Sequence, residues 1–95
     1  ASVEAEDRRQ QLSREMEQLQ MKLQRQANSL KYYTDAALKE ADELQRNAIL
    51  LYEASETSMT DLVQSLHTSI NIHKQYIEAL QQYNLTAIEL ELYTK

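Results

Sequence analysis

Few side chains in this sequence could perform chemistry, and the two histidines are the first to consider. His67 and His73 lie six residues apart, which puts them on different faces of a helix. A helical metal site takes ligands three or four residues apart, so the pair does not form one. His67 with Asp61 or Gln64 makes a poor ligand set. His73 falls in an apolar row, where we expect a polar residue of a helix–helix contact.

Carboxylates and nucleophiles give no catalytic arrangement either. Glu40, Asp42 and Glu43 cluster in one segment, but a tuned carboxylate needs neighbours that remove water from it, and this cluster reads as a solvated face. The chain has no Cys and no Gly. These absences exclude a thiol nucleophile, a thiolate metal site and a glycine-rich phosphate loop. We therefore predict that the chain is not an enzyme and holds no metal or cofactor.

The tyrosines raise the question of nucleic acid, because aromatic rings can stack on bases. Tyr52, Tyr76 and Tyr83 could form such a platform, but stacking sites come with cationic grooves. The net charge is −5, and no basic stripe interrupts the sequence. We predict no nucleic-acid partner and expect these rings to fill gaps between helices, with their hydroxyls reaching water or a partner.

The elements that carry these residues are predicted to be long helices. The 95 residues include neither Gly nor Pro, the usual residues of turns in sheet proteins. Apolar residues recur at alternating spacings of three and four over residues 3–54, the pattern of a coiled coil, so we predict one helix there. Alanines replace leucines in the second row partway along, which predicts closer packing in that half. The two rows are Met16, Leu23, Leu30, Ala37, Leu44 and Leu51, flanked by Leu12, Leu19, Ala27, Ala41 and Ala48.

The helical pattern breaks once, at a run rich in Ser and Thr. Such side chains compete for backbone hydrogen bonds and favour helix caps. Ser58 and Asp61 have the spacing of a capping box. We predict a turn at residues 55–58 and a second helix at residues 59–93. Because no Gly is present to end the first helix, a little strain or a wider loop is expected.

The second helix is predicted to be apolar on more than one side. A helix of this kind is buried on several faces, so one partner helix cannot cover it. Its predicted contact row toward the first helix is Val63, Leu66, Ile70, Ile77, Leu80 and Ala87. Further apolar residues lie outside that row: Leu62, Ile72, Tyr76, Ala79, Tyr83, Leu85, Ile88, Leu90 and Leu92.

The two helices differ in length, which predicts uncovered surface. At about 1.5 Å per residue they span roughly 78 and 51 Å. Folding at residue 57 pairs residue 93 with about residue 21, so residues 1–20 are expected to lack a partner within the chain. We predict an all-α antiparallel coiled-coil hairpin that self-associates, most simply as a four-helix bundle built from two hairpins.

The region around the break resembles the periplasmic hairpin tip of TolC-type outer-membrane efflux proteins. The resemblance rests on residues 48–63 at the tip, on a segment with the family's Y-x-x-A-x-x-x-Y-N pattern at residues 76–84, and on an A-x-x-x-L segment in residues 87–92. Tyr32 and Tyr33, with the Ala- and Leu-rich run after them, are most similar to the heavy-metal efflux branch. In some relatives of that branch the segment is joined to an inner-membrane cation efflux pump of the resistance–nodulation–division type.

This resemblance implies both an architecture and a location. The chain would be the last periplasmic hairpin of a larger α-barrel domain, in which three protomers form an export channel across the periplasm. Its partners would be the periplasmic adaptor and the inner-membrane pump, and it would lie in the periplasm as part of an outer-membrane or envelope-spanning complex. Two alternatives stay open: the hairpin of an adaptor protein, and a coiled-coil scaffold with no transport role.

The resemblance also assigns roles to residues at the tip. Asp61 and Gln64 match positions at the channel constriction, where an acidic ring would attract cations. Ser55 stands where the family usually has Gly. The residues that would face the adaptor are Tyr52, Ala54, Ser55, Glu56, Thr57 and Ser58.

Overall fold

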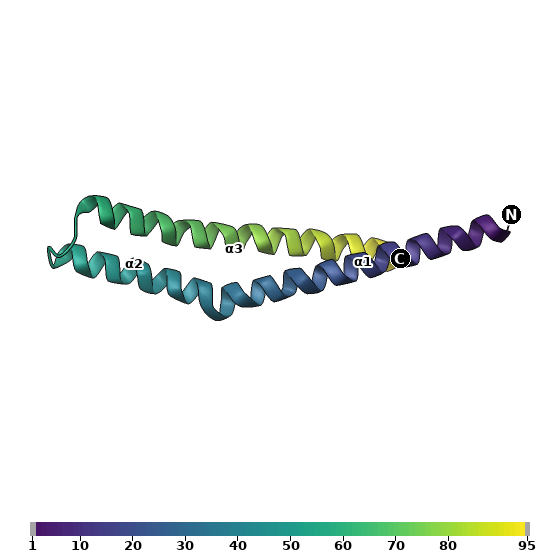
Figure 1. Cartoon of the computed structure of the whole chain (residues 1–95), viewed down its shortest axis with the longest axis horizontal. Helices are drawn as coiled ribbons and strands as arrows, with labels where there is room; N and C mark the ends of the chain where they lie inside the picture. Colours follow the sequence, from purple (N-terminus) through teal and green to yellow (C-terminus); the bar gives the residue numbers. More distant parts are fainter. Residues whose placement is uncertain (1, 95) are drawn as a thin grey trace.

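The computed structural model describes residues 2–94, with side chains from residue 3 onward. It consists of α1 (Ser2–Tyr32), a π-helical segment η1 (Tyr33–Ala37), α2 (Leu38–Glu53) and α3 (Met59–Thr94). The first three elements form one arm, and α3 returns beside it as the second arm (Figure 1). The predicted all-α helical hairpin is therefore confirmed; the described residues contain no strand and measure 77 × 20 × 16 Å.

The first arm is interrupted by η1, which the seven-residue pattern does not predict. The Leu38 amide donates to the carbonyl of Tyr33, five residues earlier, which is the π-helical spacing. The Thr34 hydroxyl lies 3.2 Å from the carbonyl of Leu30 and 3.1 Å from that of Lys31 and bonds to both. Threonine bonds of this kind bend helices, and the arm bends at η1 (Figure 1). The prediction of one regular α-helix over residues 3–54 is corrected accordingly.

Two small side chains between the arms are the most deeply buried of the described residues. Ala41 of α2 is fully buried, and Ser69 of α3 is 1% exposed. Ala37 and Ala48 are also buried, because their small side chains allow the helix axes to approach. The alanine-rich half of the first arm packs closely, as the sequence predicted. Two of the larger residues in its predicted rows, Leu12 and Leu51, are exposed. The others are half-buried between the arms: Met16, Leu19, Leu23, Leu30 and Leu44.

The predicted contact row of α3 is wrong for four of its six residues, while the other two, Leu66 and Ala87, are half-buried. Val63, Ile70, Ile77 and Leu80 are between 37% and 60% exposed. A different row, seven residues apart, faces the first arm and is buried or half-buried. Beside the alanines of α2 the space suits a small side chain such as Ser69, and a branched residue there would be overpacked. The observed row is Leu62, Ser69, Tyr76, Tyr83 and Leu90.

The contact between the arms also reaches further along α1 than predicted. The Tyr93 hydroxyl bonds to Glu15, whereas the pairing inferred from the turn placed residue 93 near residue 21. Glu15, Met16 and Leu19 are half-buried, so the expectation that residues 1–20 lack an intrachain partner is wrong for residues 15–20. Residues 3–14 are exposed along their whole length, and α1 extends past the end of α3 (Figure 1).

Candidate interaction site at the hairpin tip

We define the tip of the hairpin as residues 50–59. Two backbone hydrogen bonds cap the C-terminal end of α2 in the first half of the tip. The Ser55 amide donates to the Tyr52 carbonyl at 3.0 Å, and the Glu56 amide donates to the Leu51 carbonyl at 2.8 Å. These two bonds define a Schellman motif. Ser55 adopts φ 59°, the left-handed conformation that Gly usually supplies there. The missing Gly therefore leads to local strain at Ser55 in a compact turn.

The second half of the tip caps the start of α3. The Ser58 Oγ accepts a hydrogen bond from the Asp61 amide at 3.1 Å, and the Ser58 carbonyl accepts one from the Leu62 amide at 3.0 Å. Ser58 is thus the N-cap residue. The Asp61 carboxylate accepts a bond from the Thr57 hydroxyl at 3.4 Å. Asp61 also lies in the first turn of α3, where its negative charge interacts favourably with the helix dipole and stabilises the helix.

The tip is open to solvent, and its surface is mixed in character. Of the six residues assigned there from the resemblance, Tyr52, Ala54, Ser55, Glu56 and Ser58 are exposed and Thr57 is half-buried. Sequence reasoning missed the apolar residues that border this polar turn. They are Ile49, Leu50, Leu51 and Met59, all exposed. The run of apolar residues from Ala48 to Tyr52 was the available signal, because five consecutive positions cannot all face one partner helix.

Asp61 and Gln64 lie close behind the tip on the first turns of α3. Both side chains are exposed, and residues three apart share a helix face. The Gln64 carbonyl accepts a bond from the Thr68 hydroxyl at 3.1 Å. One hairpin supplies one Asp61 carboxylate, so a ring of charge at this level requires further copies or further hairpins.

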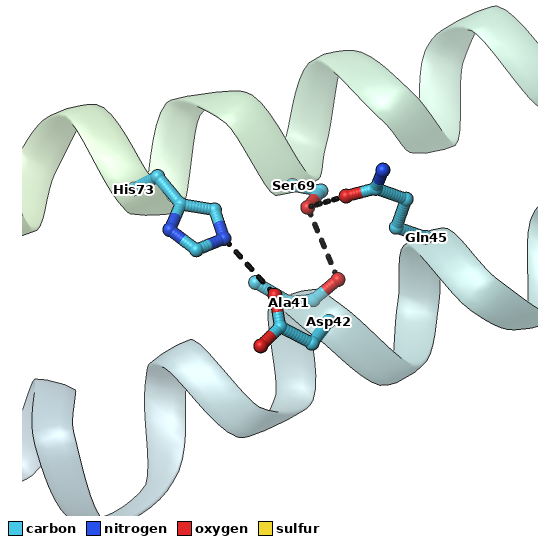
Figure 2. A network of polar contacts seen from close by, with 5 residues as sticks. All are labelled: Ala41, Asp42, Gln45, Ser69 and His73. Atoms are coloured by element: carbon cyan, nitrogen blue, oxygen red, sulfur yellow. Dashed lines mark hydrogen bonds and ion pairs between the residues drawn. The ribbon is translucent and has the colours of Figure 1, made fainter.

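A polar cluster joins α2 and α3 midway along the hairpin (Figure 2). The buried Ser69 hydroxyl donates to the Ala41 carbonyl at 3.1 Å and lies 3.4 Å from Gln45 Oε1. His73 Nε2 lies 3.2 Å from Asp42 Oδ1. His73 is half-buried between the arms, as expected for a polar residue of a helix–helix contact.

This cluster contains Ser, His and Asp, the residue types of a catalytic triad, but the three side chains are not arranged as in a triad. A triad needs the hydroxyl bonded to the imidazole. The Ser69 hydroxyl bonds instead to a backbone carbonyl and a Gln side chain, and His73 bonds to Asp42. Each of these contacts links one arm to the other, so the cluster fixes the register of the hairpin.

The tyrosines divide into half-buried and exposed residues. Tyr76 and Tyr83 are half-buried between the arms, as predicted for rings that fill helix–helix gaps. The Tyr76 ring lies 6.0 Å from that of Tyr33 across the hairpin, within the range of favourable aromatic pairs. Tyr33 also meets Tyr32 edge to face at 5.9 Å. Tyr52 is exposed at the tip and belongs to its surface.

Within residues 2–94, no group of three or more His, Asp or Glu side chains is arranged to hold a metal ion. None of the helices described here combines the length and the apolar character needed to cross a membrane. No protein-family model, curated protein or solved structure matches the chain.

Proposed function

We propose that the chain is a periplasmic helical hairpin of a TolC-type outer-membrane factor in a tripartite efflux system, of the branch that exports heavy-metal cations. The hairpin would form part of the wall of the export channel, and its tip would face the periplasmic adaptor. In the intact assembly three protomers would close the wall into a barrel, coupled through the adaptor to an inner-membrane pump of the resistance–nodulation–division type.

The observation that carries this proposal is that α3 has apolar residues on two different faces. One face packs against the first arm through Ser69 and Tyr76, while Ile70 and Ile77 stay exposed on another. A helix in a wall has a neighbour on each side and needs an apolar face toward both. A hairpin that acts alone needs only one such face on α3. The exposed face therefore supports a lateral neighbour.

The tip supports the second half of the proposal. It combines a polar turn with bordering apolar residues, among them Leu50, Tyr52 and Met59. Protein interfaces combine apolar and polar contact surface, and both kinds are exposed at the tip. The Schellman motif and the Ser58 cap hold the turn in one conformation. The turn would therefore lose little conformational entropy on docking.

Disruption of the gene tests the proposal. We expect its loss to increase sensitivity to divalent heavy-metal ions, and a wild-type copy to restore resistance. A copy with Leu50→Glu should fail to restore it, because a charge would enter the docking surface. Met21→Glu is the matched control, because Met21 is equally exposed but lies far from the tip. Unchanged metal sensitivity after disruption would remove the efflux role and favour the scaffold.

Asp61 would serve the channel as well as the helix cap. Carboxylates brought together near a shared axis attract cations, and Asp61 is exposed just behind the tip. Asp61→Asn in the intact assembly should lower its cation preference in conductance measurements. Ser58→Ala removes the cap without removing charge and should leave the preference unchanged. An unaltered preference in the Asp61 variant would restrict that residue to capping.

A further inference from the structure

α3 carries a row of exposed apolar residues that the first arm does not cover, and Lys74 and Gln81 are exposed within this row. We call the apolar residues of this row the outer stripe, and they are 44–65% exposed. At 100° per residue, its mean direction lies roughly 130° around the helix axis from the row that faces the first arm. One neighbour cannot cover both surfaces. The outer stripe consists of Met59, Val63, Ile70, Ile77, Leu85, Ile88 and Leu92.

Charged residues at the middle of the stripe have the arrangement of a self-complementary surface. Lys74 and Glu78 border the same shallow groove as Ile70 and Ile77. The stripe runs from residue 59 to residue 92, so its centre lies near residue 76, midway between Lys74 and Glu78. An antiparallel copy related by a two-fold axis at that point brings each Lys74 opposite a Glu78. A parallel copy in register brings like charges to the same level instead.

We propose that a second copy of this chain docks on the outer stripe, α3 against α3 and antiparallel, about a two-fold axis near residue 76. Val63 of one copy then lies near Ile88 of the other at each end. Because the two faces of α3 point in widely different directions, the four helices form a layer in the order arm, α3, α3, arm. This differs from the enclosed four-helix bundle expected from the sequence.

The first arm of another copy is a poorer occupant than α3. Beside scattered apolar residues such as Leu12 and Met21, its exposed positions carry many charged side chains, including Arg9, Glu17, Lys39 and Arg46. Seating the apolar stripe on them would bury charges without partners, which is costly. Two outer stripes placed together bury apolar surface on both sides.

The size of the contact predicts a reversible dimer. The stripe is about 50 Å long, and a strip about 10 Å wide gives roughly 500 Å² on each copy. The total of roughly 1,000 Å² falls at the low end of specific interfaces. We therefore expect dimers at about 100 µM and dissociation on dilution.

This dimer is distinct from the proposed barrel. Its two tips point to opposite ends, whereas hairpins in a channel wall present their tips to one adaptor. The two assemblies would compete for the outer stripe. Solution measurements on the 95-residue chain test the dimer, and metal resistance in cells tests the barrel, so one proposal can fail without the other.

Sedimentation of charge variants tests the arrangement. Lys74→Glu alone and Glu78→Lys alone should each weaken dimerisation, because each places like charges opposite each other. An equimolar mixture of the two variants should restore it as a heterodimer. Lys39→Glu and Glu43→Lys form the matched control, because these residues have the same spacing and are exposed on α2. A mixture that sediments no faster than its components would overturn the antiparallel pairing.

Disulfide trapping tests the register, and the absence of native Cys makes the readout clean. In the proposed dimer, Ile77→Cys places the two thiols about 3 Å apart along the helix axes, whereas Ile88→Cys separates them by about 36 Å. Oxidation should therefore crosslink the first variant and leave the second monomeric under denaturing electrophoresis. Ile70→Ser should raise the dissociation constant by on the order of 100-fold, because two buried Ile side chains are lost per dimer. A wild-type chain that is monomeric at about 100 µM would overturn the proposal.

Discussion

The Tyr93 hydroxyl donates a 2.9 Å hydrogen bond to Glu15 Oε2, joining residues 78 positions apart at the open end of the hairpin. The bond raises the pKa of Tyr93 above its usual value, chiefly because a carboxylate accepts the phenol hydrogen. The negative charge of Glu15, partial desolvation and the charge of Glu89 act in the same direction. The contact therefore links the ends of α1 and α3 only while the phenol is protonated.

This contact predicts a stability change in alkaline solution. Because the folded-state pKa of Tyr93 is raised, its contribution is fully present below the unfolded pKa, about 10. It is lost as the pH rises through the higher folded-state pKa. Above about pH 10, the urea midpoint of the wild type should therefore fall more steeply than that of Tyr93→Phe. Parallel pH profiles for the two proteins would contradict the contact.

Ser55 predicts a stabilising substitution at the tip. Its φ of 59° costs an L-residue about 1–2 kcal/mol, while Gly adopts it freely but loses more chain entropy on folding. Ser55→Gly should therefore raise the free energy of unfolding by about 0.5 kcal/mol, measured by urea titration followed by circular dichroism. Ser55→Val should lower it, because branched residues disfavour this conformation. A destabilising Gly would contradict the left-handed backbone.

The hairpin itself could be predicted from the sequence because its signals are local. The rows through Leu23 and Leu30 alternate at spacings of three and four, and the run around Ser58 contains a cap pattern. The tip also follows from local chemistry: Ser58 caps α3, which begins at Met59. The strain at Ser55 was one of two outcomes expected from the missing Gly.

The choice of contact face on α3 could not be predicted, because two apolar stripes compete. Ile70 and Ile77 are more apolar than Ser69 and Tyr76, so hydrophobicity favours the wrong row. Which row of α3 faces the first arm depends on how closely Ala41 allows the arms to approach, and this is a property of the packed hairpin. The π-helical segment after Tyr32 could not be predicted either, because Leu30, Ala37 and Leu44 keep the seven-residue spacing across it.

Ser69 is almost completely buried and bonds to the Ala41 carbonyl, so we predict that its position tolerates only a small side chain. Ser69→Ala should lower the free energy of unfolding by about 0.5–1.5 kcal/mol through loss of the hydrogen bond to Ala41. Ser69→Ile should cost about 1–3 kcal/mol, because the larger side chain must separate the helices. Both changes are measured by urea titration in dilute solution, which keeps self-association from adding to the stability.

The neighbouring Thr68 supplies the control for both substitutions. Thr68 is exposed on the same helix, and its hydroxyl bonds to the Gln64 carbonyl of that helix and not to the first arm. Thr68→Ala and Thr68→Ile should therefore change the free energy of unfolding much less than the Ser69 variants do. Equal effects at the two positions would contradict the close contact between the arms.

Gln26 predicts a second stabilising substitution, on α1. Its Oε1 is buried and has no hydrogen-bond partner within the described residues. An unsatisfied buried acceptor is destabilising because it has lost its water without gaining a partner. Met has a similar length and no such oxygen, so Gln26→Met should raise the free energy of unfolding by about 1 kcal/mol. Gln20→Met is the control and should change little, because Gln20 is exposed on the same helix. A loss of stability confined to the Gln26 variant would mean that this oxygen is bonded in solution.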